Sequence, residues 1–64
     1  MERVALHSIV VPVYNEEQVL ALFYERACQA FAHLERFELI FVDDGSTDST
    51  PDLLVGLSAA DPRV

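Results

Sequence analysis

Apolar residues gather in four stretches along the chain, and the spacing within each stretch predicts an element. Residues 7–13 and 37–42 are runs of mostly branched or aromatic residues, typical of strands covered on both faces of a parallel sheet. Between them, apolar residues recur three or four positions apart, which predicts a helix over about residues 16–34. A second helix is expected to begin with Thr50 as N-cap and Pro51 at its first position, and to stop at Asp61-Pro62.

The order strand, helix, strand predicts a βαβ unit with parallel strands and a right-handed crossover, and therefore the α/β class. Asn15 is expected to cap the first helix, with Gln18 completing a capping box. Pro12 cannot donate a ladder hydrogen bond and should mark the end of the first strand, whereas Val64 would begin a further strand. Both strands then end at the same edge of the sheet, where ligands bind in parallel α/β folds.

Two turns are thus expected to face one crevice, the first over residues 12–16 and the second over residues 43–48. The first turn has no glycine and, with Glu17 directly after it, carries two carboxylates, so a pyrophosphate could not approach its backbone as in a dinucleotide-binding fold. A P-loop is excluded for the same reason, and because the turn lacks the lysine that a P-loop requires. A receiver-like Mg²⁺ pocket would need acids from different strand ends, whereas nearly all of the acids here lie in one loop.

These turns have the groups needed to hold a base and a ribose. Tyr14 offers a flat face for stacking, and Asp43 and Asp44 can accept hydrogen bonds from a base N–H or from ribose hydroxyls. Structural interpretations stay open: Asp44-Gly45 as a turn pair, Glu16 as a charge at a helix N-terminus, and Tyr14 as an exposed aromatic over the sheet edge. Asp48 is expected to cap or brace its turn.

Size and charge narrow the classes of function. A chain of 64 residues is short for an α/β domain, yet 52% of it is hydrophobic, so we expect its apolar surface to meet a partner or the rest of a larger domain. The formal net charge of −7 argues against nucleic-acid binding and implies a divalent cation between these acids and any diphosphate. The single cysteine, Cys28, favours a reduced, cytoplasmic setting, and the chain shows neither a signal peptide nor an apolar run of roughly 20 residues.

Two motifs, residues 8–17 (SIVVPVYNEE) and residues 38–50 (ELIFVDDGSTDST), resemble the family 2 glycosyltransferases of the GT-A fold. The resemblance covers nearly the whole chain and is greatest to the polyprenyl-phosphate sugar transferases, the dolichol-phosphate mannose synthase-like branch. It implies that residues 1–64 are the N-terminal part of a Rossmann-like nucleotide-sugar-binding domain with an incomplete sheet. The whole enzyme would transfer a sugar from a nucleoside-diphosphate sugar to an acceptor such as a polyprenyl phosphate.

The resemblance also implies which residues meet the nucleotide sugar, without assigning a catalytic residue: Pro12, Tyr14, Glu16, Val42, Asp43 and Asp44. The family's Mg²⁺ or Mn²⁺ site, an Asp-x-Asp motif, has no counterpart in this sequence. We therefore expect this chain alone to bind no metal and to transfer no sugar, and any membrane contact to come from a missing C-terminal part. The alternative is a non-catalytic module that forms homo-oligomers through exposed strand edges or apolar faces.

Overall fold

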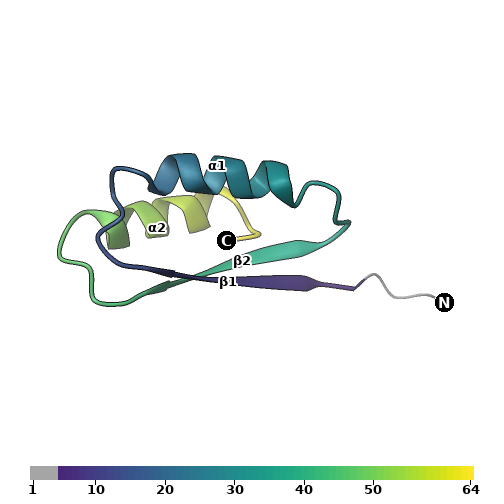
Figure 1. Ribbon diagram of the computed structural model, residues 1–64. Helices are drawn as coiled ribbons and strands as arrows, with labels where there is room; N and C mark the ends of the chain where they lie inside the picture. Colours follow the sequence, from purple (N-terminus) through teal and green to yellow (C-terminus); the bar gives the residue numbers. More distant parts are fainter. Residues whose placement is uncertain (1–4) are drawn as a thin grey trace.

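The computed structural model of the chain describes residues 5–64, which form a β-α-β-α unit (Figure 1). Strand β1 spans His7–Val13, helix α1 Leu20–Ala30, strand β2 Phe37–Asp43 and helix α2 Thr50–Ala60. The strands pair in parallel, with register partners running from His7 and Phe37 to Val13 and Asp43. The α/β class, the parallel pairing and the positions of both strands are confirmed.

Both helices lie over the same face of the two-stranded sheet (Figure 1). Alternate residues of each strand point toward them, and the most buried side chains are Leu39 of β2 and Leu20 of α1, with 2% and 1% of their surface exposed. Around Leu39 pack Phe37 and Ala27, with partly buried neighbours from both strands, from α1 and the segment that follows it, and from Val64. The core is therefore a single thin layer between the sheet and the helices.

The opposite face of the sheet is uncovered in this chain. Val10 of β1 is 60% exposed, and its register partner Ile40 is 42% exposed. Pro12 and Val42, the next pair on the same face, are exposed as well. The expectation that both faces are covered is wrong for this chain, because successive right-handed crossovers that step in one direction place their helices on the same side.

The chain returns to β2 after α2. The carbonyl oxygen of Arg63 accepts a hydrogen bond of 2.7 Å from the N–H of Leu39, on the edge of β2 that faces away from β1. Val64 is not part of a strand in the described residues, but the chain arrives alongside β2 where the sequence predicted a further strand.

Helix α1 is shorter than the predicted 16–34, and the predicted cap at its start is wrong. Val19 occupies the N-cap position and makes no side-chain cap hydrogen bond. Asn15 instead has a φ of 49°, outside the helical region, and its side chain binds the other loop rather than forming a capping box with Gln18. Residues 15–17 are thus bound across the sheet edge, and the Glu16 carbonyl accepts hydrogen bonds from the N–H groups of Val19 and Leu20 in a turn that leads into α1.

Helix α2 begins one residue earlier than predicted. Ser49 takes the N-cap position, Thr50 is the first helical residue, and proline follows in the first turn as expected. Asp61 lies at the C-cap, where the sequence predicted the stop. Cys28 sits within α1 and packs partly buried against the core, where it acts as a small apolar side chain.

Candidate functional site

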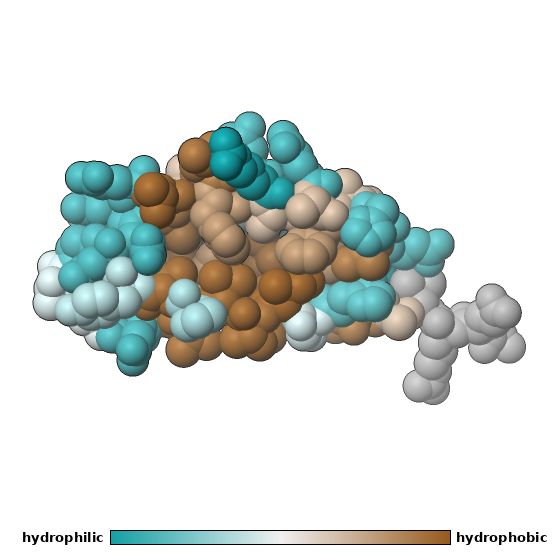
Figure 2. Space-filling view, viewed as in Figure 1, coloured by the Kyte–Doolittle hydropathy of each residue, from teal (hydrophilic) through white to brown (hydrophobic). Residues whose placement is uncertain are grey.

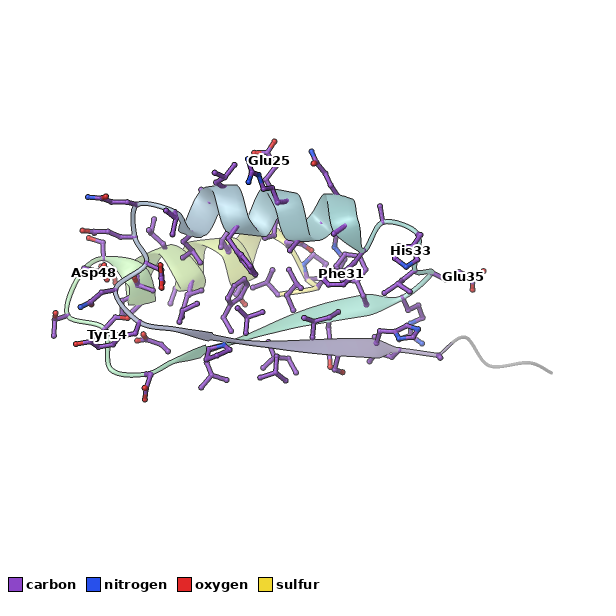
Figure 3. The ribbon with its side chains drawn as sticks, viewed as in Figure 1. Tyr14, Glu25, Phe31, His33, Glu35 and Asp48 are labelled. Carbon is purple, nitrogen blue, oxygen red and sulfur yellow. The ribbon has the colours of Figure 1, made fainter. Side chains whose placement is uncertain are left out.

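Two loops meet at the carboxyl edge of the sheet. The first loop, residues 14–19, follows β1, and the second loop, residues 44–49, follows β2. Because Val13 and Asp43 are register partners, both loops leave the sheet at the same level, and Asp44 N–H donates a hydrogen bond of 2.9 Å to the Val13 carbonyl. Figure 3 shows Tyr14 and Asp48 together at this end, far from His33 and Glu35 at the other. The predicted shared edge is confirmed.

The backbone of the first loop donates into side chains of the second loop and the helix after it. Asn15 N–H donates to Ser46 Oγ at 2.8 Å, and Glu17 N–H donates to Asp48 Oδ2 at 3.3 Å. Glu16 N–H donates to the hydroxyl of Thr50 at 2.9 Å. Thr50 is fully buried, so this hydroxyl satisfies a backbone donor that has little access to water.

Side chains of the first loop in turn accept hydrogen bonds from the backbone of the second loop. Asn15 Oδ1 accepts hydrogen bonds from the N–H groups of Thr47 at 2.8 Å and Asp48 at 3.4 Å. Glu17 Oε2 accepts one from Ser49 N–H at 3.0 Å. The two loops therefore bind each other in both directions and form one continuous rim.

Asp43 and Gly45 shape the start of the second loop. Asp43 Oδ1 accepts hydrogen bonds from the N–H and the hydroxyl of Ser46. Gly45, with a φ of 84°, supplies the left-handed conformation that turns the chain back toward Asp43. Asp43 is thus both a predicted ligand residue and part of the turn.

Asp48 braces its own loop, as predicted. Its Oδ1 accepts a hydrogen bond of 2.8 Å from Thr50 N–H at the start of α2, while Oδ2 is bound by the first loop. Desolvation alone would raise the pKa of the Asp48 carboxyl, but hydrogen bonds from Thr50 and from the Glu17 backbone outweigh it, so the pKa is lowered. The carboxylate is held in its charged form within the rim.

The structure places the predicted site residues on this rim or just beneath it. Tyr14 is 53% exposed, and both Asp43 and Asp44 are exposed. Pro12 and Val42 are register partners at the end of the uncovered face. Glu16 lines a separate hollow of about 200 Å³, together with Pro12 and apolar residues of β1 and α1. The structure therefore brings Tyr14, Asp43 and Asp44 to one edge of the sheet. Glu16 instead lines the hollow between β1 and α1.

A second polar cluster, which the sequence reasoning missed, joins α1 to the end of α2. The buried Asp61 carboxylate accepts a hydrogen bond from the Tyr24 hydroxyl at 2.5 Å and pairs with Arg63 Nη2 at 2.8 Å. The Arg63 guanidinium also lies over the Phe37 ring, 4.8 Å from its centroid. Only the proximity of Asp61 and Arg63 in the sequence hinted at this cluster, since Tyr24 lies 37 positions away.

These contacts shift three pKa values. Hydrogen bonds from Arg63 and Tyr24 lower the pKa of the Asp61 carboxyl well below its usual range. The hydrogen bond to Asp61 and desolvation raise the pKa of Tyr24 to about 12, and the same carboxylate raises the pKa of Arg63. Asp61 is therefore charged at neutral pH and holds the chain end against the core.

Neither a membrane span nor a metal site is present in residues 5–64. No helix there has the length and apolar character to cross a bilayer. Nor do those residues bring together three or more His, Cys, Asp or Glu side chains that could hold a metal ion.

The profile of the family described as Glycosyl transferase family 2 matches residues 8–64. The chain belongs to this family. The confirmed β-α-β-α unit, with two parallel strands in an open sheet, is a Rossmann-like piece of the GT-A fold. No solved structure matches the chain.

Curated glycosyltransferases are similar to the chain along most of its length. An uncharacterized glycosyltransferase, YkcC, of Bacillus subtilis (strain 168) is 46% identical over 65 residues, covering 100% of the chain and 20% of that protein. A prophage bactoprenol glucosyl transferase homolog of Escherichia coli (strain K12) is 39% identical over 59 residues, 89% of the chain and 19% of that protein.

A third relative is the undecaprenyl-phosphate 4-deoxy-4-formamido-L-arabinose transferase of Photorhabdus laumondii subsp. laumondii. It is 44% identical over 55 residues, 84% of the chain and 17% of that protein. The chain thus spans about a fifth of the length of these relatives. The resemblance to family 2 glycosyltransferases, including transferases named for polyprenyl phosphates, is confirmed.

Proposed function

We propose that this chain forms the base- and ribose-binding part of a glycosyltransferase that takes its sugar from a nucleoside-diphosphate sugar. The observation that carries the proposal is the rim itself, where six hydrogen bonds between the first loop and the residues from Ser46 to Thr50 fix the edge at which Tyr14, Asp43 and Asp44 lie. A rim that is already rigid before binding loses little entropy when a ligand arrives.

The exposed groups on the rim suit a nucleoside. The Tyr14 ring, about half exposed, offers a surface on which a base can stack. The exposed carboxylates of Asp43 and Asp44 are acceptors only, and they match the N–H groups of a base and the hydroxyls of a ribose. In this proposal Pro12 and Val42 supply apolar contact beneath the base, and Glu16 lies beside it.

The diphosphate requires groups that residues 5–64 do not bring together. Those residues contain no set of three acidic, His or Cys side chains arranged for a cation, and Asp43 Oδ1 is already bound by Ser46. The described residues therefore do not fit the Mg²⁺ or Mn²⁺ site of the family. We propose that such a cation is held elsewhere in the complete enzyme.

The acceptor and the cellular location are part of the same proposal. Relatives named bactoprenol and undecaprenyl-phosphate transferases support a polyprenyl phosphate as the acceptor of the whole enzyme. The free thiol of Cys28 supports a reduced, cytoplasmic setting for the domain. Any membrane contact is assigned to parts outside this chain.

Nucleoside titration of the 64-residue chain tests the proposal. Uridine and guanosine are the probes, since they carry the base and ribose without the phosphates that a chain of net charge −7 repels. Chemical-shift changes in an NMR titration should be confined to the two loops for at least one nucleoside. Asp44→Asn and Tyr14→Ala should each weaken binding by about tenfold, the loss expected for one good hydrogen bond or stacking contact.

Glu25→Gln is the matched control, because Glu25 lies exposed on α1 away from the loops (Figure 3). It removes one negative charge, as Asp44→Asn does, and should leave the affinity unchanged. If neither nucleoside shifts loop resonances, or if Glu25→Gln weakens binding as much as Asp44→Asn, the proposal is wrong.

A second candidate function, self-association without catalysis, is favoured by the exposed apolar surface. Val10, Pro12, Ile40 and Val42 form the uncovered sheet face, and α1 and β1 flank an apolar groove of about 530 Å³. Figure 2 shows apolar side chains gathered over the middle of the molecule, while polar side chains cover the loop end. Sedimentation decides between the two: a folded monomer at micromolar concentration would count against self-association, and loss of a dimer in Val10→Lys would support it.

A further inference from the structure

Asn15 has an unusual conformation for a residue with a side chain. Its φ of 49° lies in the left-handed region, which asparagine tolerates better than most residues because its short amide can bind nearby backbone. Asn15 therefore meets a conformational requirement of the first loop. Its contacts extend well beyond that loop.

The Asn15 side chain binds two consecutive backbone groups of the second loop. Its Oδ1 accepts hydrogen bonds from Thr47 and Asp48, which lie 32 and 33 positions away. An oxygen with two acceptor sites can satisfy both N–H groups at once. The side chain thus sets the distance between the two loops directly.

The Asn15 backbone reaches a predicted ligand residue through a single intermediate. Asn15 N–H donates to Ser46 Oγ at 2.8 Å, and the same hydroxyl donates to Asp43 Oδ1. Ser46 N–H donates to that oxygen as well, at 3.2 Å. Because both bonds engage Oδ1, they fix the carboxylate plane and direct its other oxygen away from Ser46.

We propose that Asn15 is a positioning residue of the nucleoside site and that it orients the Asp43 carboxylate through Ser46. The inference rests on the proposed function. In it, Asn15 holds Thr47 and Asp48 from one side and Ser46 from the other, so Asp43 is presented to the base or ribose in one orientation. An amide suits this place because it accepts two hydrogen bonds without adding charge beside Glu16, Glu17 and the acids of the second loop.

Two substitutions separate the acceptor from the backbone conformation. Asn15→Gly permits the positive φ but removes Oδ1. Asn15→Asp keeps an acceptor oxygen of nearly the same shape. Uridine and guanosine are again the probes, since the extra charge of the aspartate has no phosphate to repel.

Asn15→Gly should weaken nucleoside binding by about tenfold, as expected when two hydrogen bonds that fix the site are lost. It should also speed hydrogen exchange at the Thr47 and Asp48 amides. Glycine keeps the N–H that binds Ser46, but without Oδ1 the two loops are no longer held at a fixed distance, so the Ser46 contact loosens and the carboxyl carbon resonance of Asp43 should shift. Asn15→Asp should restore affinity to within about threefold of wild type and restore slow exchange at both amides, because the acceptor is back in place.

Tyr24→Phe serves as the stability control. It removes the hydrogen bond to Asp61 in the second polar cluster, away from the two loops, and so lowers stability without touching the rim. It should leave nucleoside affinity, the exchange of the Thr47 amide and the Asp43 carboxyl resonance unchanged.

The inference is overturned if Asn15→Gly binds nucleoside as the wild type does, if Asn15→Asp is as weak as Asn15→Gly, or if Tyr24→Phe has the same effects. Should the wild-type chain bind neither nucleoside, the proposed function fails. The Asp43 carboxyl resonance then decides the positioning role by itself: a shift in Asn15→Gly that Asn15→Asp reverses supports it, and no shift refutes it.

Discussion

The two glycines of this chain meet opposite demands. Gly45 has a φ of 84° in the second loop, whereas Gly56 lies within α2, where every residue except proline favours the helical conformation more than glycine does. A methyl group built at either position meets no atom of the described residues within 4 Å. Substitution by alanine therefore tests backbone conformation alone at both sites.

Gly45→Ala should lower the free energy of unfolding by about 1–2 kcal/mol, the cost of placing a side chain in the left-handed region. Gly56→Ala should raise it by about 0.5–1 kcal/mol, because alanine restricts the unfolded chain and favours the helix. Urea unfolding followed by circular dichroism measures both. Equal effects of the same sign would show that the conformation of Gly45 is not required by the fold.

At the level of single residues, sequence reasoning succeeded where a side chain acts on its own neighbours. The bracing role of Asp48 followed from its position just before a helix, and its contact with Thr50 N–H confirms it. Asn15 was misread because the same chemistry that makes it a good cap also lets it bind a distant loop. Nothing in the sequence reports that Thr47 and Asp48 lie within reach of its oxygen, since only the pairing of the strands brings them there.

The strands were easier to predict than the helices. Mostly apolar runs define β1 and β2, and the parallel pairing followed from the helix between them. The apolar spacing extends beyond α1 at both ends, because a hydrophobic pattern does not reveal that backbone groups of residues 15–17 are bound by the second loop. The pattern therefore located α1 but not its ends.

Helix α1 and the end of α2 are coupled through Asp61, and this coupling depends on pH. The folded state lowers the pKa of Asp61, and of Asp48, below the unfolded value of about 3.9. The resulting stabilisation is complete above that value and is lost as the pH falls through the folded pKa. We therefore expect the free energy of unfolding to decrease steadily below about pH 5.

Asp61→Asn tests how much of this pH-dependent stabilisation comes from the buried Asp61 carboxylate. It should cost about 2 kcal/mol at pH 7, because charge-assisted hydrogen bonds to Tyr24 and Arg63 are weakened. It should also flatten the acid limb of the profile, which unfolding at pH 3 to 7 measures. An acid limb as steep as that of the wild type would assign the effect to other carboxylates.

At alkaline pH the free energy of unfolding depends on the same polar cluster, through Tyr24. The pKa of Tyr24 is raised to about 12, so the neutral phenol is favoured in the folded state. This contribution is present below the unfolded pKa of about 10 and is lost as the pH rises toward the folded value. Tyr24→Phe should remove it and also make the acid limb shallower, because the Tyr24 hydroxyl is one of the donors that lower the pKa of Asp61.

For the molecule as a whole, we expect sugar transfer to require groups that residues 5–64 do not bring together. Residues 5–64 hold no arrangement of side chains for a cation that would stabilise a departing nucleoside diphosphate. We expect no sugar transfer by the 64-residue chain from radiolabelled UDP-glucose or GDP-mannose to a polyprenyl phosphate, with Mg²⁺ or Mn²⁺ present. Product above a protein-free blank would contradict this, and a full-length relative such as the bactoprenol glucosyl transferase homolog is the positive control.

The hydrogen bonds that join the two loops connect residues between 31 and 34 positions apart. None of them can form until the whole βαβ unit has closed, so their formation carries the entropy cost of a long loop. Folding and assembly of the rim are then a single cooperative event. A nucleoside that touches both loops would bind only the folded chain, and at a tenfold excess over its dissociation constant it would add about 1.4 kcal/mol to the free energy of unfolding. Bound nucleoside would therefore stabilise the folded chain by joining its two loops, in addition to the single layer of core side chains.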